Sequence, residues 1–153
     1  ADAVVSKILR HYEVQSDDKM PAGNVQANYD LINTLCDADN AAEICEKILS
    51  YETDDKWLNR AIDTLRKGCP VTPHLVVAQM QHGKNLSLAD VFRMELVISR
   101  HCAAAGHFKE GVRALLIDKD RNPNWRYKNI ADVPQAEVDS FFVPFSDDPL
   151  KNL

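Results

Sequence analysis

Residues 107–125 read HFKEGVRALLIDKDRNPNW, and this stretch decides the fold more than any other part of the chain. Helical spacing places four apolar side chains on one face, namely Phe108, Val112, Leu115 and Leu116. Gly111 interrupts the pattern at a cost of about 1 kcal/mol, which a helix tolerates where another backbone or a ligand comes close. The sequence therefore predicts a helix over residues 107–119 that docks on another surface, followed by a turn at residues 122–124.

Outward from this stretch, apolar residues recur at helical spacing and predict an all-α, irregular multi-helix fold. An opening helix carries Val4, Val5, Ile8 and Leu9 on one face, and residues 15–24 resemble a loop. Two helices follow, one around residues 31–35 and one over residues 41–49. We expect Asp39 or Asn40 to cap the second of these two helices.

Start and stop signals predict the remaining helices. Thr53 is the expected cap of a helix that ends at Gly68, and Thr72 with Pro73 begins a helix that ends at Gly83. Ser87 and Asp90 suggest a capping box for the next helix. Six of the eight residues 91–98 are apolar, so we expect that helix at the centre of the fold, packed on at least two faces.

The domain organisation expected from the sequence is one helical domain over residues 1–143 and a loose tail over residues 144–153. A last helix begins at Pro134 and runs to Phe142. The chain has 153 residues, 45% of them hydrophobic and 27% charged, as in ordinary globular proteins. No internal repeat is visible.

Charge and hydropathy exclude several classes of partner. The formal net charge of −5 argues against binding to nucleic acid, which depends on clustered Lys and Arg. No apolar run approaches the roughly 20 residues that span a bilayer, and the first residues lack a secretory signal. The four cysteines form no CxxC pair and lie among apolar neighbours, which favours buried free thiols in a reducing compartment over a disulfide framework: Cys36, Cys45, Cys69 and Cys102.

Two blocks of the sequence resemble the C-terminal part of the crotonase superfamily, which includes enoyl-CoA hydratases and isomerases. Residues 87–100, SLADVFRMELVISR, resemble a helix with a Met-Glu core followed by a serine, and residues 108–125 carry EGVRA, IDKD and a final Pro-x-Trp. The likeness is strongest to the branch that contains 3-hydroxyisobutyryl-CoA hydrolases. It extends more weakly over residues 56–83 and about the whole chain.

This resemblance implies catalysis on an acyl-CoA thioester by two peptide N–H groups and acidic side chains that belong to an N-terminal β/α spiral domain. The present sequence has five glycines, none in a Gly-rich loop, and no run typical of a buried strand. We therefore expect a helical C-terminal domain that lacks the spiral domain, contains no catalytic residue and is inactive alone. Its implied partners are the missing catalytic domain, acyl-CoA through the parent enzyme, and a homo-oligomer.

Coenzyme A proximity is the one binding role that the resemblance suggests for particular residues. Lys119 and Arg121 could contact phosphates, and the indole of Trp125 could stack on adenine. The alternative is a solvated charged turn in which Trp125 covers the helix end. No cofactor is expected.

Other candidate residues have structural explanations. Arg93 and Glu95 suggest a buried ion pair or packing role, with Arg100 or Arg113 as partner for Glu95. Glu110 and Arg113 are three residues apart and should meet on a helix surface. The histidines match no metal motif, and His101 and His107 flank a predicted helix break at Gly106. No nucleophile motif is present.

Three functions remain open from the sequence. The first is the C-terminal helical domain of an acyl-CoA thioester hydrolase of valine breakdown, which packs on the catalytic domain and narrows the acyl-CoA pocket. The second is the same domain of an enoyl-CoA hydratase or isomerase. The third is a non-enzymatic helical interaction module. The expected compartment is the bacterial cytoplasm or, in a eukaryote, the mitochondrial matrix.

Overall fold

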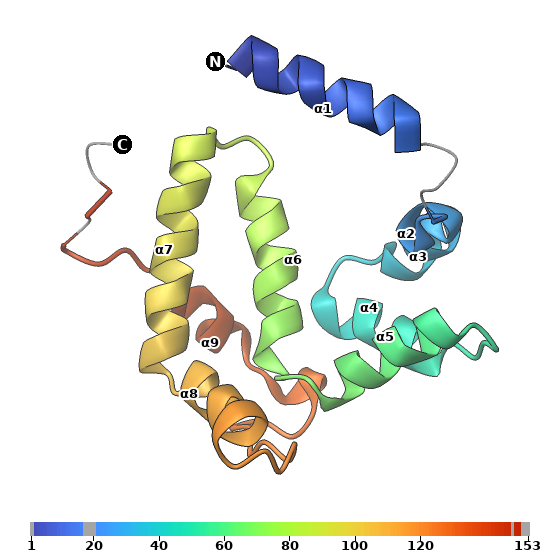
Figure 1. Ribbon diagram of the computed structural model, residues 1–153. Helices are drawn as coiled ribbons and strands as arrows, with labels where there is room; N and C mark the ends of the chain where they lie inside the picture. Colours follow the sequence, from blue (N-terminus) through green and yellow to red (C-terminus); the bar gives the residue numbers. More distant parts are fainter. Residues whose placement is uncertain (1, 17–20, 148, 151–153) are drawn as a thin grey trace. The chain divides into compact units, whose positions relative to one another are not determined.

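The computed structural model describes residues 2–16, 21–147 and 149–150, and every regular element in them is a helix (Figure 1). This confirms the all-α prediction. The contacts divide the chain into two compact units, Ala1–Thr34 and Leu35–Leu153, where the sequence suggests one domain over residues 1–143. None of the helices in the described part of the chain is long and apolar enough to cross a membrane.

The first unit contains α1 (Asp2–Ser16), α2 (Asn24–Ala27) and most of α3 (Tyr29–Cys36). The predicted opening helix is confirmed, but α1 contains no buried residue and its apolar side chains are exposed. Helix α1 continues to Ser16, so the predicted loop is shorter than residues 15–24 at both ends. Its residues 17–20 lie outside the described residues.

Two well-capped helices begin the second unit, α4 (Ala41–Ser50) and α5 (Lys56–Lys67). Asn40 caps α4, because its Oδ1 accepts a hydrogen bond from the Glu43 N–H at 3.0 Å. The predicted cap of α5 is wrong by two residues: Asp55 Oδ1 accepts from Trp57 and Leu58, while the Thr53 hydroxyl oxygen accepts from Asp55 N. The Asp55 carboxylate lies next to the helix and accepts from two N–H groups of its first turn, so α5 begins directly after Asp55.

Helices α6 (Val71–Gly83) and α7 (Leu88–Ala104) run side by side in the second unit (Figure 1). Ser87 caps α7 as predicted, accepting from Asp90 N. The predicted central burial of residues 91–98 is wrong, because only Ile98 of α7 is fully buried and Phe92 remains 49% exposed. The apolar core covers one face of α7, and an open groove borders another.

The main core of the second unit is entirely apolar. It joins α6, α7, α9 (Gln135–Ser140) and the residues just after α9 and after the 3-10 helix η3 (Ile130–Asp132) through six buried side chains: Val71, Leu75, Ile98, Val133, Val138 and Phe141. The described residues include no buried polar or charged residue. The predicted final helix is shorter than residues 134–142, with Pro134 just before its first turn.

Expected to be loose, the tail from Pro144 contacts α7 through its described residues. Phe145 stacks on His101 with ring centroids 4.4 Å apart, and the Asp147 carboxylate accepts from the Arg100 guanidinium at 3.1 and 3.2 Å. Arg93 Nε also donates to the Leu150 carbonyl at 3.2 Å. The described residues of the tail therefore lie against α7.

The cysteines differ from the expectation at one position. Cys45 is buried, and burial raises the pKa of its thiol. Cys69 and Cys102 are half-buried, but Cys36, the last residue of α3, is exposed. All four are free thiols.

Candidate functional site

The predicted docking helix consists of two helical types. Helix α8 (His107–Val112) continues as a π-helix, η2 (Arg113–Ile117), which ends where Asp118 N donates to the Arg113 carbonyl at 2.8 Å. Gly106, with φ 84°, separates α7 from α8, and this is the helix break that the sequence predicts. Short π-helical turns are uncommon and often occur at functional sites.

The apolar face of this segment is exposed in this chain. We call it the α8–η2 apolar face and define it by four side chains: Phe108, Leu115, Leu116 and Ile117. Their exposed fractions lie between 60% and 70%, whereas Ala114 on the opposite side is buried. Of the face predicted from helical spacing, only Val112 is partly covered.

Gly111 allows the close approach that the sequence suggests, and the group that approaches is Trp125. A Cβ atom at Gly111 would lie 3.4 Å from Cη2 of the indole. The indole N–H donates to the Lys67 carbonyl at the end of α5 at 3.3 Å. Trp125 therefore packs on α8 and ties the turn to a second helix.

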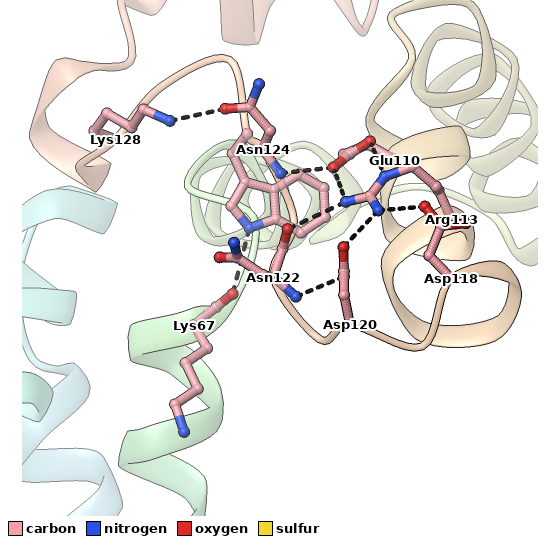
Figure 2. A network of polar contacts seen from close by, with 9 residues as sticks. Lys67, Glu110, Arg113, Asp118, Asp120, Asn122, Asn124 and Lys128 are labelled. Atoms are coloured by element: carbon pink, nitrogen blue, oxygen red, sulfur yellow. Dashed lines mark hydrogen bonds and ion pairs between the residues drawn. The ribbon is translucent and has the colours of Figure 1, made fainter.

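Arg113 is the hub of the polar network in Figure 2. Its guanidinium donates to the Glu110 carboxylate at 2.8 and 3.0 Å, which confirms the predicted pair. Nη1 also donates to Asp118 and Asp120, each at 2.7 Å. Nη2 completes the set with the Asn122 carbonyl at 3.1 Å.

Backbone groups of the turn join the same network. Glu110 Oε1 accepts from Asn124 N at 2.6 Å, and Asp120 Oδ1 accepts from Asn122 N at 2.9 Å. Lys128 Nζ donates to the Asn124 side-chain oxygen at 2.9 Å. Arg113, a side chain of the π-helix, thus holds residues 118–124 in place. We call this segment the charged turn.

Hydrogen bonds rather than burial control the ionisation of this network. Donation from Arg113, and then from the Asn124 N–H, lowers the pKa of Glu110 to about 2. The Arg113 and Asn122 donors lower the pKa of Asp120 as well, and the carboxylates raise the pKa of Arg113. Glu110, Asp120 and Arg113 are therefore charged at neutral pH.

Lys119 and Arg121, two of the predicted coenzyme-binding residues, lie in this turn with strained backbones. Their φ angles are 55° and 54°, in the left-handed region that costs an L-residue about 1–2 kcal/mol. Both side chains are exposed, and Arg121 N donates to the Ala114 carbonyl at 3.0 Å. Trp125, the third predicted residue, is half-buried under the turn.

Sequence reasoning missed Asp118 and Asp120 as partners of Arg113. The available signal was the alternating run DKDR directly after the helix, in which alternate charges can turn towards the arginine. It also named the wrong partner for Glu95, which is exposed and accepts from Gln79 at 2.9 Å. Arg93 binds Asp90 at 2.6 Å, because helical geometry brings residues three apart together.

Three of the histidines contact backbone or thiol groups. His74 contacts the Ile130 carbonyl at 2.9 Å and His101 the Val143 carbonyl at 2.8 Å. His107 Nδ1 lies 3.6 Å from the Cys69 sulfur, its buried Nε2 has no partner, and burial lowers the pKa of the ring. Among residues 2–16, 21–147 and 149–150, no cluster of three metal-binding side chains occurs.

Comparison with known proteins identifies the family. The sequence profile of the enoyl-CoA hydratase/isomerase family matches residues 1–142. The mitochondrial 3-hydroxyisobutyryl-CoA hydrolase of Gallus gallus is 30% identical over 96% of this chain, and that of Dictyostelium discoideum is 34% identical over 93%. The chain spans only 38% and 37% of these two proteins, in their C-terminal part.

A solved structure supports the same assignment. An enoyl-CoA hydratase from Rhodobacter sphaeroides superposes on 82% of this chain with a TM-score of 0.70 and 28% identity, and the chain covers 36% of that protein. The resemblance of residues 87–125 to this family is thus confirmed independently by profile, by pairwise identity and by fold. The chain belongs to the enoyl-CoA hydratase/isomerase family.

Proposed function

We propose that this chain is the helical part of an acyl-CoA thioester hydrolase resembling 3-hydroxyisobutyryl-CoA hydrolase, and that it packs on a separate catalytic domain. The relatives with that name match nearly the whole chain but extend well beyond it. The groups that would activate water and hold a thioester oxygen then belong to the rest of the enzyme. No described residue of this chain has a catalytic role in the proposal.

The α8–η2 apolar face is the observation that carries the proposal. Four large apolar side chains are exposed within ten residues of chain, and three of them are consecutive. Contiguous exposed apolar surface is uncommon on a free-standing domain and usually marks an interaction site. The catalytic domain is the occupant that the family assignment favours, and burial there would exclude water from the adjoining turn.

The charged turn is the proposed point of contact with coenzyme A. Lys119 and Arg121 would bind phosphate groups, and Trp125 would hold the turn from below rather than stack on adenine, because its ring packs on Gly111. Backbone strain at two basic positions, Lys119 and Arg121, supports this role, since such strain is retained mainly at functional sites. An oligomer and a mitochondrial location are further proposals, the latter suggested by the relatives' names.

The competing function is the same part of an enoyl-CoA hydratase or isomerase. The similarity to the Rhodobacter enzyme favours it, and the charged turn would serve either reaction because both substrates carry coenzyme A. Assays of the full-length enzyme separate them. A hydrolase releases the free thiol of coenzyme A. A hydratase adds water to the enoyl double bond, so the absorbance of the enoyl-CoA falls and no thiol is released.

A chimera tests the docking role. The matching part of the Dictyostelium hydrolase is replaced by this chain, and thiol release from 3-hydroxyisobutyryl-CoA is compared with that of the truncated hydrolase. We expect the chimera to regain activity and Leu116→Asp to abolish the gain, while Met80→Asp on the exposed side of α6 leaves it intact. Full activity of the Leu116→Asp chimera would contradict the proposal, as would enzyme-like turnover by this chain alone.

The coenzyme contact is tested in the same chimera. Lys119→Gln and Arg121→Gln should each raise KM about five- to tenfold with kcat nearly unchanged, because a phosphate contact acts equally on ground and transition states. Lys84→Gln, at an exposed position after α6, is the control. Unchanged KM in both turn variants would remove the coenzyme role and leave the docking role standing.

A further inference from the structure

A groove of about 470 Å³ lies between α7 and the chain segment after α9. Its walls are mainly apolar, with Met94 and Val97 from α7 on one side and Phe142 and Phe145 on the other. This volume is within the range of small-molecule sites, which are apolar clefts with a few placed polar groups. The groove shares no residue with the charged turn or the α8–η2 apolar face.

The polar group at the rim of this groove that matters most is Arg100. Its guanidinium carbon lies 4.0 Å from the centre of the Phe145 ring, so the ring orients the cation at the edge of the groove. Nη2 donates to both carboxylate oxygens of Asp147, at 3.1 and 3.2 Å, and Nη1 to the Asp147 carbonyl at 2.9 Å. Arg100 therefore already holds one carboxylate, supplied by the chain itself.

We propose that the groove binds an aliphatic monocarboxylate, whose head group replaces the Asp147 carboxylate on Arg100 and whose chain lies along Met94 and Val97. The proposal does not depend on the proposed function, because it uses none of the same residues. In this proposal, Asp147 competes with the ligand carboxylate for Arg100. The apolar walls of the groove favour ligands with a hydrocarbon chain.

Exchange of the two carboxylates is physically reasonable. The Asp147 side chain is 75% exposed and that of Arg100 is 34% exposed, and exposed ion pairs contribute little net stability. A ligand carboxylate would make the same charge-assisted hydrogen bonds and would also bury its methylene groups. A carboxylate is favoured over a larger anion because one already occupies the guanidinium in this geometry.

Titration with octanoate tests the site, with methyl NMR of labelled methionine as the readout. Met94 lines the groove and Met80, on the exposed side of α6, does not. We expect saturable shifts of the Met94 methyl signal, assigned with Met94→Leu, and none of the Met80 signal. Octanol and acetate should each bind at least tenfold more weakly, because one lacks the charge and the other the hydrocarbon chain.

Two variants with opposite expected effects sharpen the test. Arg100→Gln should weaken octanoate binding about tenfold, whereas Asp147→Asn should strengthen it severalfold by removing the competitor. Val97→Trp should fill the groove and block binding; circular dichroism checks that each variant is folded. Equal affinity for octanol and octanoate, absence of Met94 shifts, or weaker binding by Asp147→Asn would overturn the proposal.

Discussion

The core around Phe141 and the turn around Arg113 are held together by opposite means. The core is formed by six buried apolar side chains, and no polar or charged residue in the described part of the chain is fully buried. The turn consists of exposed and half-buried side chains joined by charge-assisted hydrogen bonds to one guanidinium. Burial gives stability with little directional preference, whereas the hydrogen bonds set the conformation of a few residues. Changes in the core should therefore alter stability, and changes in the turn should alter local structure.

Phe141→Ala gives the largest expected effect on the core. Phe141 is 2% exposed, and removal of a buried aromatic ring destabilises a protein by about 3–5 kcal/mol through lost burial and a cavity. Urea denaturation followed by circular dichroism measures the loss. Phe108→Ala is the matched control, because Phe108 is 67% exposed and should change stability by less than about 0.5 kcal/mol. Similar losses in the two variants would erase the distinction between core and docking face.

Two glycines at the ends of α8 give the next effect. Gly106 has φ 84°, so Gly106→Ala should destabilise the protein by about 1–2 kcal/mol from backbone strain alone, since no atom lies within 4 Å of the added Cβ. Gly111→Ala gains helix propensity and meets Trp125 at 3.4 Å, so its net change should stay below about 1 kcal/mol. Thermal denaturation measures the stability of both variants. A greater loss of stability in Gly111→Ala than in Gly106→Ala would contradict this order.

Local signals explain how much of the fold could be predicted from the sequence. The caps Asn40 and Ser87, the stop at Gly68 and the break at Gly106 each depend on a few neighbouring residues. The pair Glu110–Arg113 was likewise predictable because helical geometry brings residues three apart together. Such features need no knowledge of tertiary contacts.

The parts that could not be predicted depend on distant contacts. The sequence places residues 91–98 at the centre because it cannot show which faces of α7 have neighbours. It gives no sign that Phe145 and Asp147 return to Arg100, 45 and 47 residues earlier. At the candidate site, the coenzyme role of Lys119 and Arg121 stays a prediction. The π-helix that directs Arg113 towards Asp118 and Asp120 could not be predicted, because it depends on backbone geometry.

Arg113→Gln should have a smaller effect on global stability than Phe141→Ala or Gly106→Ala. Its main effect should be on the local structure of the turn. The variant loses the donors that hold Asp118, Asp120 and the Asn122 carbonyl. Amide hydrogen exchange should speed up at Asn122 and Asn124, while amides of the core keep their protection. Arg66→Gln is the control, because Arg66 pairs with Asp63 on the exposed side of α5. Loss of protection throughout the core would mean that the turn is part of the same cooperative unit.

Acid should produce the smallest effect on the turn. The pKa of Glu110 is lowered from 4.5 to about 2, so its stabilising contribution is fully present above pH 4.5 and is lost as the pH falls towards 2. The amide signal of Asn124, which donates to Glu110, should therefore stay unchanged at pH 4 and shift only below about pH 3. Glu110→Gln should remove this transition, because an amide does not titrate. A shift centred near pH 4.5 in the unmodified protein would show that Arg113 does not hold Glu110 ionised, and Glu110 would then contribute no pH-dependent stability to the turn.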